Sequence, residues 1–129
     1  MTYSNMILLY VSDPAASARF YGRLFGRAPV EESPTFVLFV LSSGLRVGLW
    51  GRGGVAPAPT ALPGASEIGF NVKEIEAVDA THADWVRRGA QIALPPTDLD
   101  FGRSFVAVDP DGHRLRVYAF AEGSLPVDA

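Results

Sequence analysis

The sequence has no cysteine, only two histidines and two tryptophans, and no long run of apolar residues. Without cysteine the chain cannot form disulfides, thiolate metal sites or a cysteine nucleophile. The apolar stretch at residues 6–11 is far too short to span a membrane, and neither a charged leader nor a small-residue cleavage site accompanies it. We therefore expect a cytoplasmic protein with no membrane partner.

An excess of positive charge is also missing. The chain has 14 acidic and 11 basic residues, the two signs are interspersed, and the formal net charge is −3. Proteins that bind nucleic acids normally display a basic patch, so no nucleic-acid partner is expected. The 129 residues are 48% hydrophobic, which is enough for one compact domain with a core of its own.

The expected elements occur in the same order twice. In the first half a helix begins after the N-cap Asp13 with Pro14 at its first position, and Gly26 ends it. In the second half the corresponding helix ends at Gly89. The expected strands cover residues 6–11, 28–31, 36–41 and 45–50, then 66–72, 90–94, 104–109 and 113–120. Two βαβββ units of matching size are the simplest interpretation, and they predict an α+β fold.

The boundaries of these units follow from composition. Gly and Pro are concentrated between the halves, which predicts a linker without regular structure, and the last residues look like a loose tail. We expect a single domain over 1–129, with the first unit at 5–50, the linker at 51–65, the second unit at 66–120 and a flexible tail at 121–129.

Side chains alternate across a strand, so odd and even positions sort into two faces of the expected sheets. The apolar face, which we expect the helices to cover, comprises Ile7, Leu9, Val11, Val47, Leu49, Ile68, Phe70, Val72, Leu115, Val117 and Ala119. The opposite face comprises Met6, Leu8, Tyr10, Arg46, Gly48, Trp50, Glu67, Gly69, Asn71, Arg114, Arg116 and Tyr118. Aromatic rings with a few polar groups are typical of a ligand cavity. A half-solvated face that carries aromatics by chance is the alternative.

Two motifs carry a resemblance to a known family. With the two βαβββ units, "YVSDPAASARFYGRLFG" after the first strand and "DPDGHRLRV" before the last make the chain similar to the vicinal oxygen chelate superfamily. That superfamily includes glyoxalases, extradiol dioxygenases and bleomycin resistance proteins. The resemblance covers about residues 5–120 and implies curved mixed sheets that form a cavity, with the helices outside. It indicates the fold well and the chemistry poorly.

Metal-dependent members of the superfamily place a His or Glu on each of four strands. The matching positions here are Met6, Gly48, Glu67 and Arg116. A thioether, a missing side chain, one carboxylate and a guanidinium do not make a zinc, nickel or iron site, so we expect neither metal nor cofactor. His82 is expected mid-helix against the sheet and His113 just after a turn, so neither completes a ligand set.

Among the members without a metal, the sequence resembles the phenazine antibiotic resistance proteins. The similar stretches are "LLYVSD", "GLWGRGG", "ASEIGFNV" and "TDLDFGRSFVAVDPDGHRLRV". The resemblance implies a homodimer that holds a planar tricyclic aromatic at its interface between aromatic side chains. Trp50 matches the residue expected to stack on the ligand; the alternative is that it merely covers the linker.

Polar residues of the same face suggest further roles. Glu67 and Arg116 are expected to form an ion pair in place of the metal, bridging two halves of a cavity or two chains. Alternatively, an arginine of this face receives a ligand carboxylate. Gly48 and Gly69 either clear space for flat rings or mark bulges. Residues 97–105 are expected to form a rim loop, with Phe101 at the entrance.

The predicted function is non-enzymatic binding and sequestration of a planar aromatic antibiotic, since no nucleophile triad or catalytic residue emerges. One alternative is a small-molecule lyase or dioxygenase of the same superfamily, with or without a metal, in which Glu67 is the general base. Another is a sensor or accessory subunit. The predicted ligand-binding residues are Trp50, Tyr10, Tyr118, Arg116, Glu67, Arg46, Gly48, Met6 and Phe101.

Overall fold

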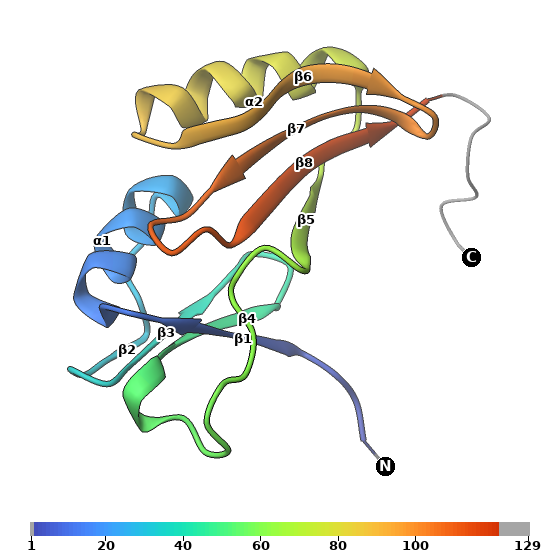
Figure 1. Cartoon of the computed structure of the whole chain (residues 1–129). Helices are drawn as coiled ribbons and strands as arrows, with labels where there is room; N and C mark the ends of the chain where they lie inside the picture. Colours follow the sequence, from blue (N-terminus) through green and yellow to red (C-terminus); the bar gives the residue numbers. More distant parts are fainter. Residues whose placement is uncertain (1, 122–129) are drawn as a thin grey trace. The chain divides into compact units, whose positions relative to one another are not determined.

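The computed structural model describes residues 2–121, and the chain divides into two compact units between Leu62 and Pro63. Each unit has the order βαβββ, so the α+β class and the duplicated architecture are confirmed (Figure 1). Residues 122–129 of the expected tail lie outside the described residues. Neither helix of the described range is long and apolar enough to cross a bilayer.

The first unit is a four-stranded sheet with one helix. Its elements are β1 (Met6–Val11), α1 (Pro14–Phe25), β2 (Glu31–Glu32), β3 (Phe36–Val40), β4 (Arg46–Gly51) and the 3₁₀ turn η1 (Arg52–Gly54). The strand order is β1-β4-β3-β2, with β1 parallel to β4 and the other pairs antiparallel. The Asp13 side chain accepts hydrogen bonds from two amides of the first turn of α1, and Gly26 ends the helix in the left-handed conformation at φ 65°.

The second unit repeats this plan. Its elements are β5 (Glu67–Asn71), α2 (Ile75–Arg87), β6 (Gln91–Leu99), β7 (Gly102–Val108) and β8 (Arg114–Phe120). The strand order is β5-β8-β7-β6, and β5 runs parallel to β8. A parallel neighbour requires a crossover connection, which α2 and the β6–β7 hairpin supply.

Each helix covers one face of its own sheet, as the alternation predicts. In the first unit α1 packs on β3 and β4, and in the second α2 packs on β6, β7 and β8 (Figure 1). Edge-to-face contacts of Trp85 with Phe70 and Phe105, at 5.4 and 5.5 Å between ring centroids, join α2 to its sheet. The predicted apolar face is buried, except that Ile7, Phe70 and Val72 are half-buried.

Three local expectations differ from the structure. The strand expected at 28–31 is β2 (Glu31–Glu32), where the edge of the sheet pairs for only two residues. The linker expected to lack regular structure begins with the turn η1. The strand expected at 90–94 continues to Leu99 through two register shifts around its prolines, which an edge strand tolerates.

The rim loop expected at 97–105 is a β-hairpin instead. Arg103 of β7 donates to Asp98 of β6 at 2.9 Å and to Asp79 of α2 at 2.8 Å, so charged hydrogen bonds fix the hairpin to its own helix. Only residues 100 and 101 form the turn. Phe101 therefore sits at the tip of a tight hairpin.

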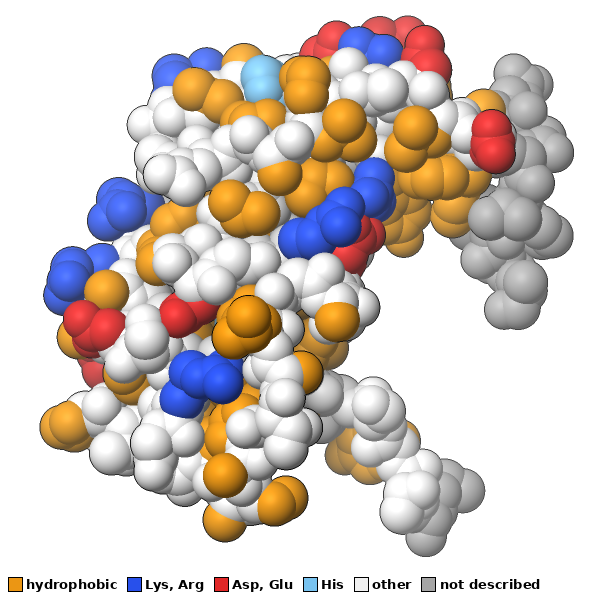
Figure 2. Space-filling view, in the orientation of Figure 1, with side chains coloured by type: hydrophobic (Ala, Val, Ile, Leu, Met, Phe, Trp, Pro, Cys, Tyr) orange, Lys and Arg blue, Asp and Glu red, His pale blue; other side chains and the backbone are white. Residues whose placement is uncertain are grey.

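Charged side chains are scattered over the visible face of the molecule. Figure 2 shows Lys and Arg interspersed with Asp and Glu rather than gathered into one basic area on this face. This agrees with the interspersed charges of the sequence.

We predict that Gly102→Ala strongly destabilises the protein. Gly102 is buried, and a Cβ there would collide with the carbonyl oxygen of Ala119 and lie 2.7 Å from the amide nitrogen of Ala121. Because these atoms belong to the backbone of β8 and of the residue that follows it, they cannot rotate away. Urea denaturation should show a loss of about 2–4 kcal/mol in the free energy of unfolding.

The matched control is Gly53→Ala. A Cβ at Gly53 meets nothing within 4 Å. This variant should stay within about 0.5 kcal/mol of the wild type. Equal effects of the two substitutions would contradict the close approach of the backbone at Gly102.

Candidate functional site

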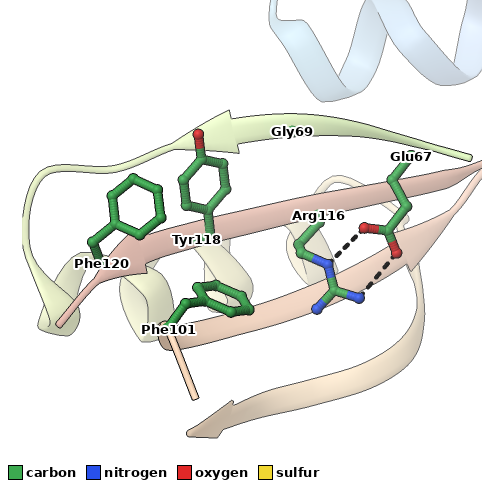
Figure 3. Close-up of a pocket in the computed structure, with 6 residues that line it drawn as sticks. All are labelled: Glu67, Gly69, Phe101, Arg116, Tyr118 and Phe120. Atoms are coloured by element: carbon green, nitrogen blue, oxygen red, sulfur yellow. Dashed lines mark hydrogen bonds and ion pairs between the residues drawn. The ribbon is translucent and has the colours of Figure 1, made fainter. Parts of the chain in front are cut away.

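A pocket of about 350 Å³ lies in the second unit, on the sheet face opposite to α2 (Figure 3). It is formed by two adjacent strands and the tip of the β6–β7 hairpin. Its lining residues are Glu67 and Gly69 from β5, Arg116, Tyr118 and Phe120 from β8, and Phe101 from the hairpin. The alternation of β8 buries Leu115, Val117 and Ala119 on one side and turns the lining residues to the other.

One end of the pocket is aromatic. The rings of Tyr118 and Phe120 lie 5.2 Å apart at an angle of 60°, and those of Phe101 and Phe120 lie 6.3 Å apart at 77°. Gly69 makes room for this cluster, because a Cβ at that position would lie 3.2 Å from Cε1 of Tyr118. Because Gly69 has no side chain, the Tyr118 ring can pack against β5.

The other end of the pocket is an ion-pair cluster. Arg116 donates from Nε to Oε1 of Glu67 at 2.7 Å and from Nη2 to Oε2 at 2.9 Å (Figure 3). The third guanidinium nitrogen, Nη1, donates to Oγ of the buried Ser104 at 2.9 Å. Arg114 Nη2 lies 3.0 Å from the same Oε2 of Glu67. One carboxylate thus holds two guanidinium groups.

The predicted Glu67–Arg116 pair is confirmed, but its location differs from the expectation. The pair joins neighbouring strands of one sheet and does not bridge two halves of a cavity or two chains. The cause is the parallel register, which places Glu67 beside Arg114 and Gly69 beside Arg116, so that Glu67 reaches both arginines. The hydrogen bond from Arg116 is the main cause that lowers the pKa of Glu67; partial burial opposes it, and the charges of both arginines lower it further.

These contacts determine what the cluster can do chemically. A carboxylate with a lowered pKa is a weak base, and both of its oxygens already accept hydrogen bonds. A divalent ion would need those oxygens and would meet the Arg116 guanidinium, so the residues do not fit a metal. Within residues 2–121 no group of three or more His, Asp or Glu side chains is arranged as metal ligands. His82 instead packs edge-on against Phe105, at 5.2 Å between ring centroids.

The remaining predicted residues share a face of the first sheet. Because Met6 pairs with Arg46 and Tyr10 with Trp50 in the parallel ladder, all four point to the side opposite to α1. The rings of Tyr10 and Trp50 meet edge to face, with centroids 6.3 Å apart. Met6 is 41% exposed.

Gly48 is predicted to clear space for a ligand, and in this structure two side chains of its own sheet lie over it. Gly48 is buried, and a Cβ there would lie 2.7 Å from Leu8 Cδ2 and 3.0 Å from Phe36 Cζ. The space above the glycine is therefore filled by these two side chains of its own sheet. Gly48 allows them to pack closely over β4.

The prediction of the site missed two residues. Phe120 continues the alternation of Arg114, Arg116 and Tyr118, and extending that pattern by one step along the strand would have found it. Ser104 pairs with Tyr118 across β7 and β8. Its contact with Arg116 depends on this register, which a serine in a mostly apolar strand does not indicate.

The sequence of the chain is similar to those of known proteins. The family model of the "Glyoxalase/Bleomycin resistance protein/Dioxygenase superfamily" matches residues 4–117. The chain is 37% identical, over 117 residues and 88% of each protein, to the phenazine antibiotic resistance protein EhpR of Enterobacter agglomerans.

Two solved structures are also similar. A protein from Agrobacterium tumefaciens, solved in solution by NMR, matches with a TM-score of 0.83 at 47% identity, over 94% of this chain and 99% of that one. The crystal structure of a glyoxalase-related enzyme from Fulvimarina pelagi matches with a TM-score of 0.78 at 29% identity, over 92% and 88%.

We predict that Glu67→Gln destabilises the protein at neutral pH but not in acid. A folded-state pKa below the ordinary value of 4.5 means that ionised Glu67 stabilises the fold above that pH, and that the stabilisation is lost as the pH falls through the lowered pKa. The free energy of unfolding should fall by about 1 kcal/mol at pH 7, and the difference from wild type should shrink towards pH 3.

The control is Glu32→Gln, which removes an exposed carboxylate from β2. It should leave the unfolding free energy within about 0.5 kcal/mol of the wild type at both pH values. A deficit in Glu67→Gln that is the same at pH 3 and pH 7 would refute the proposed ionic role.

Proposed function

The chain belongs to the Glyoxalase/Bleomycin resistance protein/Dioxygenase superfamily, and we propose that it confers antibiotic resistance by binding and sequestering a planar aromatic compound without converting it. The observation that carries this proposal is the pocket of the second unit, where three aromatic rings face a fixed ion-pair cluster. Aromatic walls with a few oriented polar groups are the usual composition of a small-molecule site.

The proposed ligand class is a phenazine or a similar fused-ring compound. The relative from Enterobacter agglomerans is a phenazine antibiotic resistance protein, and its similarity extends over 88% of both chains. Flat fused rings suit stacked or edge-to-face contacts with Phe101, Tyr118 and Phe120. Each such contact contributes about 0.5–1.5 kcal/mol beyond the burial of area. In the first unit, Trp50 and Tyr10 are the rings proposed to contact the ligand.

The chemistry of the pocket supports binding rather than turnover. Acid–base catalysis needs a group whose pKa lies near the working pH, and the contacts of Glu67 lower its pKa instead. The hydroxyl of Ser104 accepts a hydrogen bond from Arg116, and His82, which packs against Phe105 on the opposite face of the sheet, does not activate it. Turnover is the alternative function, because the similar protein from Fulvimarina pelagi is a glyoxalase-related enzyme.

We predict that the aromatic end of the pocket supplies affinity for phenazine-1-carboxylate. Isothermal titration should show saturable binding to the wild type. Tyr118→Leu and Phe101→Leu should each weaken it by about three- to tenfold, which corresponds to the loss of one ring contact. Trp50→Phe tests the proposal that Trp50 also contacts the ligand: it should remove most of the ligand-dependent quenching of tryptophan fluorescence, because Trp85, a residue of α2, is buried against its own sheet.

Tyr3→Leu is the matched control, since Tyr3 is 82% exposed and does not line the pocket. Its affinity should equal that of the wild type. Chromatography after prolonged incubation should recover the compound unchanged. Absence of saturable binding would refute the phenazine assignment, and a new product would favour the enzymatic alternative.

We also propose that the protein is a homodimer, as the resemblance to the resistance proteins implies. The uncovered face of the first sheet exposes Met6 and Leu8 by 41% and 40%, which is apolar area that a second copy can bury. Light scattering after size exclusion should give twice the chain mass of 13.8 kDa, and Leu8→Lys should shift the mass towards one chain. A single-chain mass for the wild type at micromolar concentration would refute the dimer.

A further inference from the structure

The ion-pair cluster at the end of the pocket carries more positive than negative charge. Glu67 is the one carboxylate that pairs with Arg114 or Arg116 in the described part of the chain. Two guanidinium groups on one carboxylate leave a net charge of about +1 when all three are ionised. Arg116 brings this charge to the pocket, because it lines the pocket and its side chain is 19% exposed.

The cluster also has hydrogen-bond donors to spare. A guanidinium has five N–H groups, and Arg116 uses three of them: one on Glu67 Oε1, one on Oε2 and one on Ser104 Oγ. Two N–H groups therefore remain on its terminal nitrogens. A ligand can accept from them while Arg116 keeps every existing contact. Arg114 Nε is likewise buried without a hydrogen-bond partner among the described residues.

The Arg116 guanidinium and the aromatic rings lie at opposite ends of the pocket. In Figure 3 the guanidinium nitrogen of Arg116 that does not contact Glu67 lies on the side of Phe101, and the rings of Tyr118 and Phe120 lie further along the same strand. A flat ligand that contacts these rings can thus place a substituent beside the guanidinium. An anionic substituent there meets both the spare donors and the excess charge.

We infer that the pocket selects planar aromatic ligands that carry a carboxylate or a similar anion, and that Arg114, which does not line the pocket, sets this preference. Arg114 acts through charge. Without it, Glu67 and Arg116 form a neutral pair that still donates hydrogen bonds but has no excess charge. With it, an anion is favoured over a neutral group of the same shape, and a cation is disfavoured. This inference rests on the proposed function.

The test compares two ligands of nearly equal shape, phenazine-1-carboxylate and phenazine-1-carboxamide, by isothermal titration at low salt. The wild type should bind the carboxylate about five- to tenfold more tightly. Arg114→Gln should bring this ratio below about two by weakening the binding of the carboxylate, and Glu67→Gln, which removes one negative charge, should increase the ratio. About 0.5 M NaCl should reduce the ratio in the wild type, because the cluster is only partly buried.

Arg87→Gln is the control for net charge. It removes one positive charge from an arginine of α2 that is 70% exposed, and α2 covers the opposite face of the sheet. The ratio should stay at the wild-type value in this variant. Thermal melts and the affinity for the carboxamide report whether each variant keeps a folded pocket.

The outcomes separate the two proposals. If both ligands bind the wild type with equal affinity, or if Arg114→Gln leaves the ratio unchanged, the inference about charge is wrong while the proposed function stands. If neither ligand binds, the proposed function fails, and the inference that rests on it fails too.

Discussion

The structure depends on one constraint, which is that each unit has a single helix to cover a four-stranded sheet. A helix buries one face, so alternation along every strand turns the other set of side chains away from the core. Val117 of β8 is fully buried beneath α2, whereas its neighbours Arg116 and Tyr118 line the pocket. The site is therefore a consequence of the fold, because the residues that are free to vary chemically are those that the helix does not cover.

The ion pair is the second consequence of the strand arrangement. In a parallel pair the side chains at matching positions of adjacent strands lie beside each other, and here Glu67 reaches both its register partner Arg114 and Arg116, two positions further along β8. A lone arginine at the position of Arg116, with one-fifth of its side chain exposed, would lose part of its hydration without compensation. Glu67 and the hydroxyl of Ser104 supply that compensation. They also fix the guanidinium in one orientation, which favours recognition over flexible contact.

Much of this could be predicted from the sequence, and the failures have identifiable causes. Alternation is a local property, so it predicted the buried faces and placed Glu67 and Arg116 on the same side of the sheet. The packing over Gly48 was not predictable, because it depends on which side chains of neighbouring strands fill the gap. The hairpin at 97–105 was missed since Asp and Gly suggest a loop, while the contacts of Arg103 that hold it in place involve a helix some 24 positions earlier. Local patterns do not contain such long-range partners.

The charge state of the pocket supports the proposed function, which is binding without turnover. Catalysis requires that interactions strengthen as the transition state forms, typically by moving a proton or by stabilising new charge. In this pocket the one carboxylate is already saturated by donors, and its lowered pKa keeps it ionised before and after a ligand arrives. The aromatic rings contribute equally to any bound form of a flat molecule, since stacking responds to shape and not to the progress of a reaction. Interactions of this kind lower the free energy of the complex as a whole, which suits the proposed sequestration of a toxic compound, whereas such uniform binding does not accelerate a reaction.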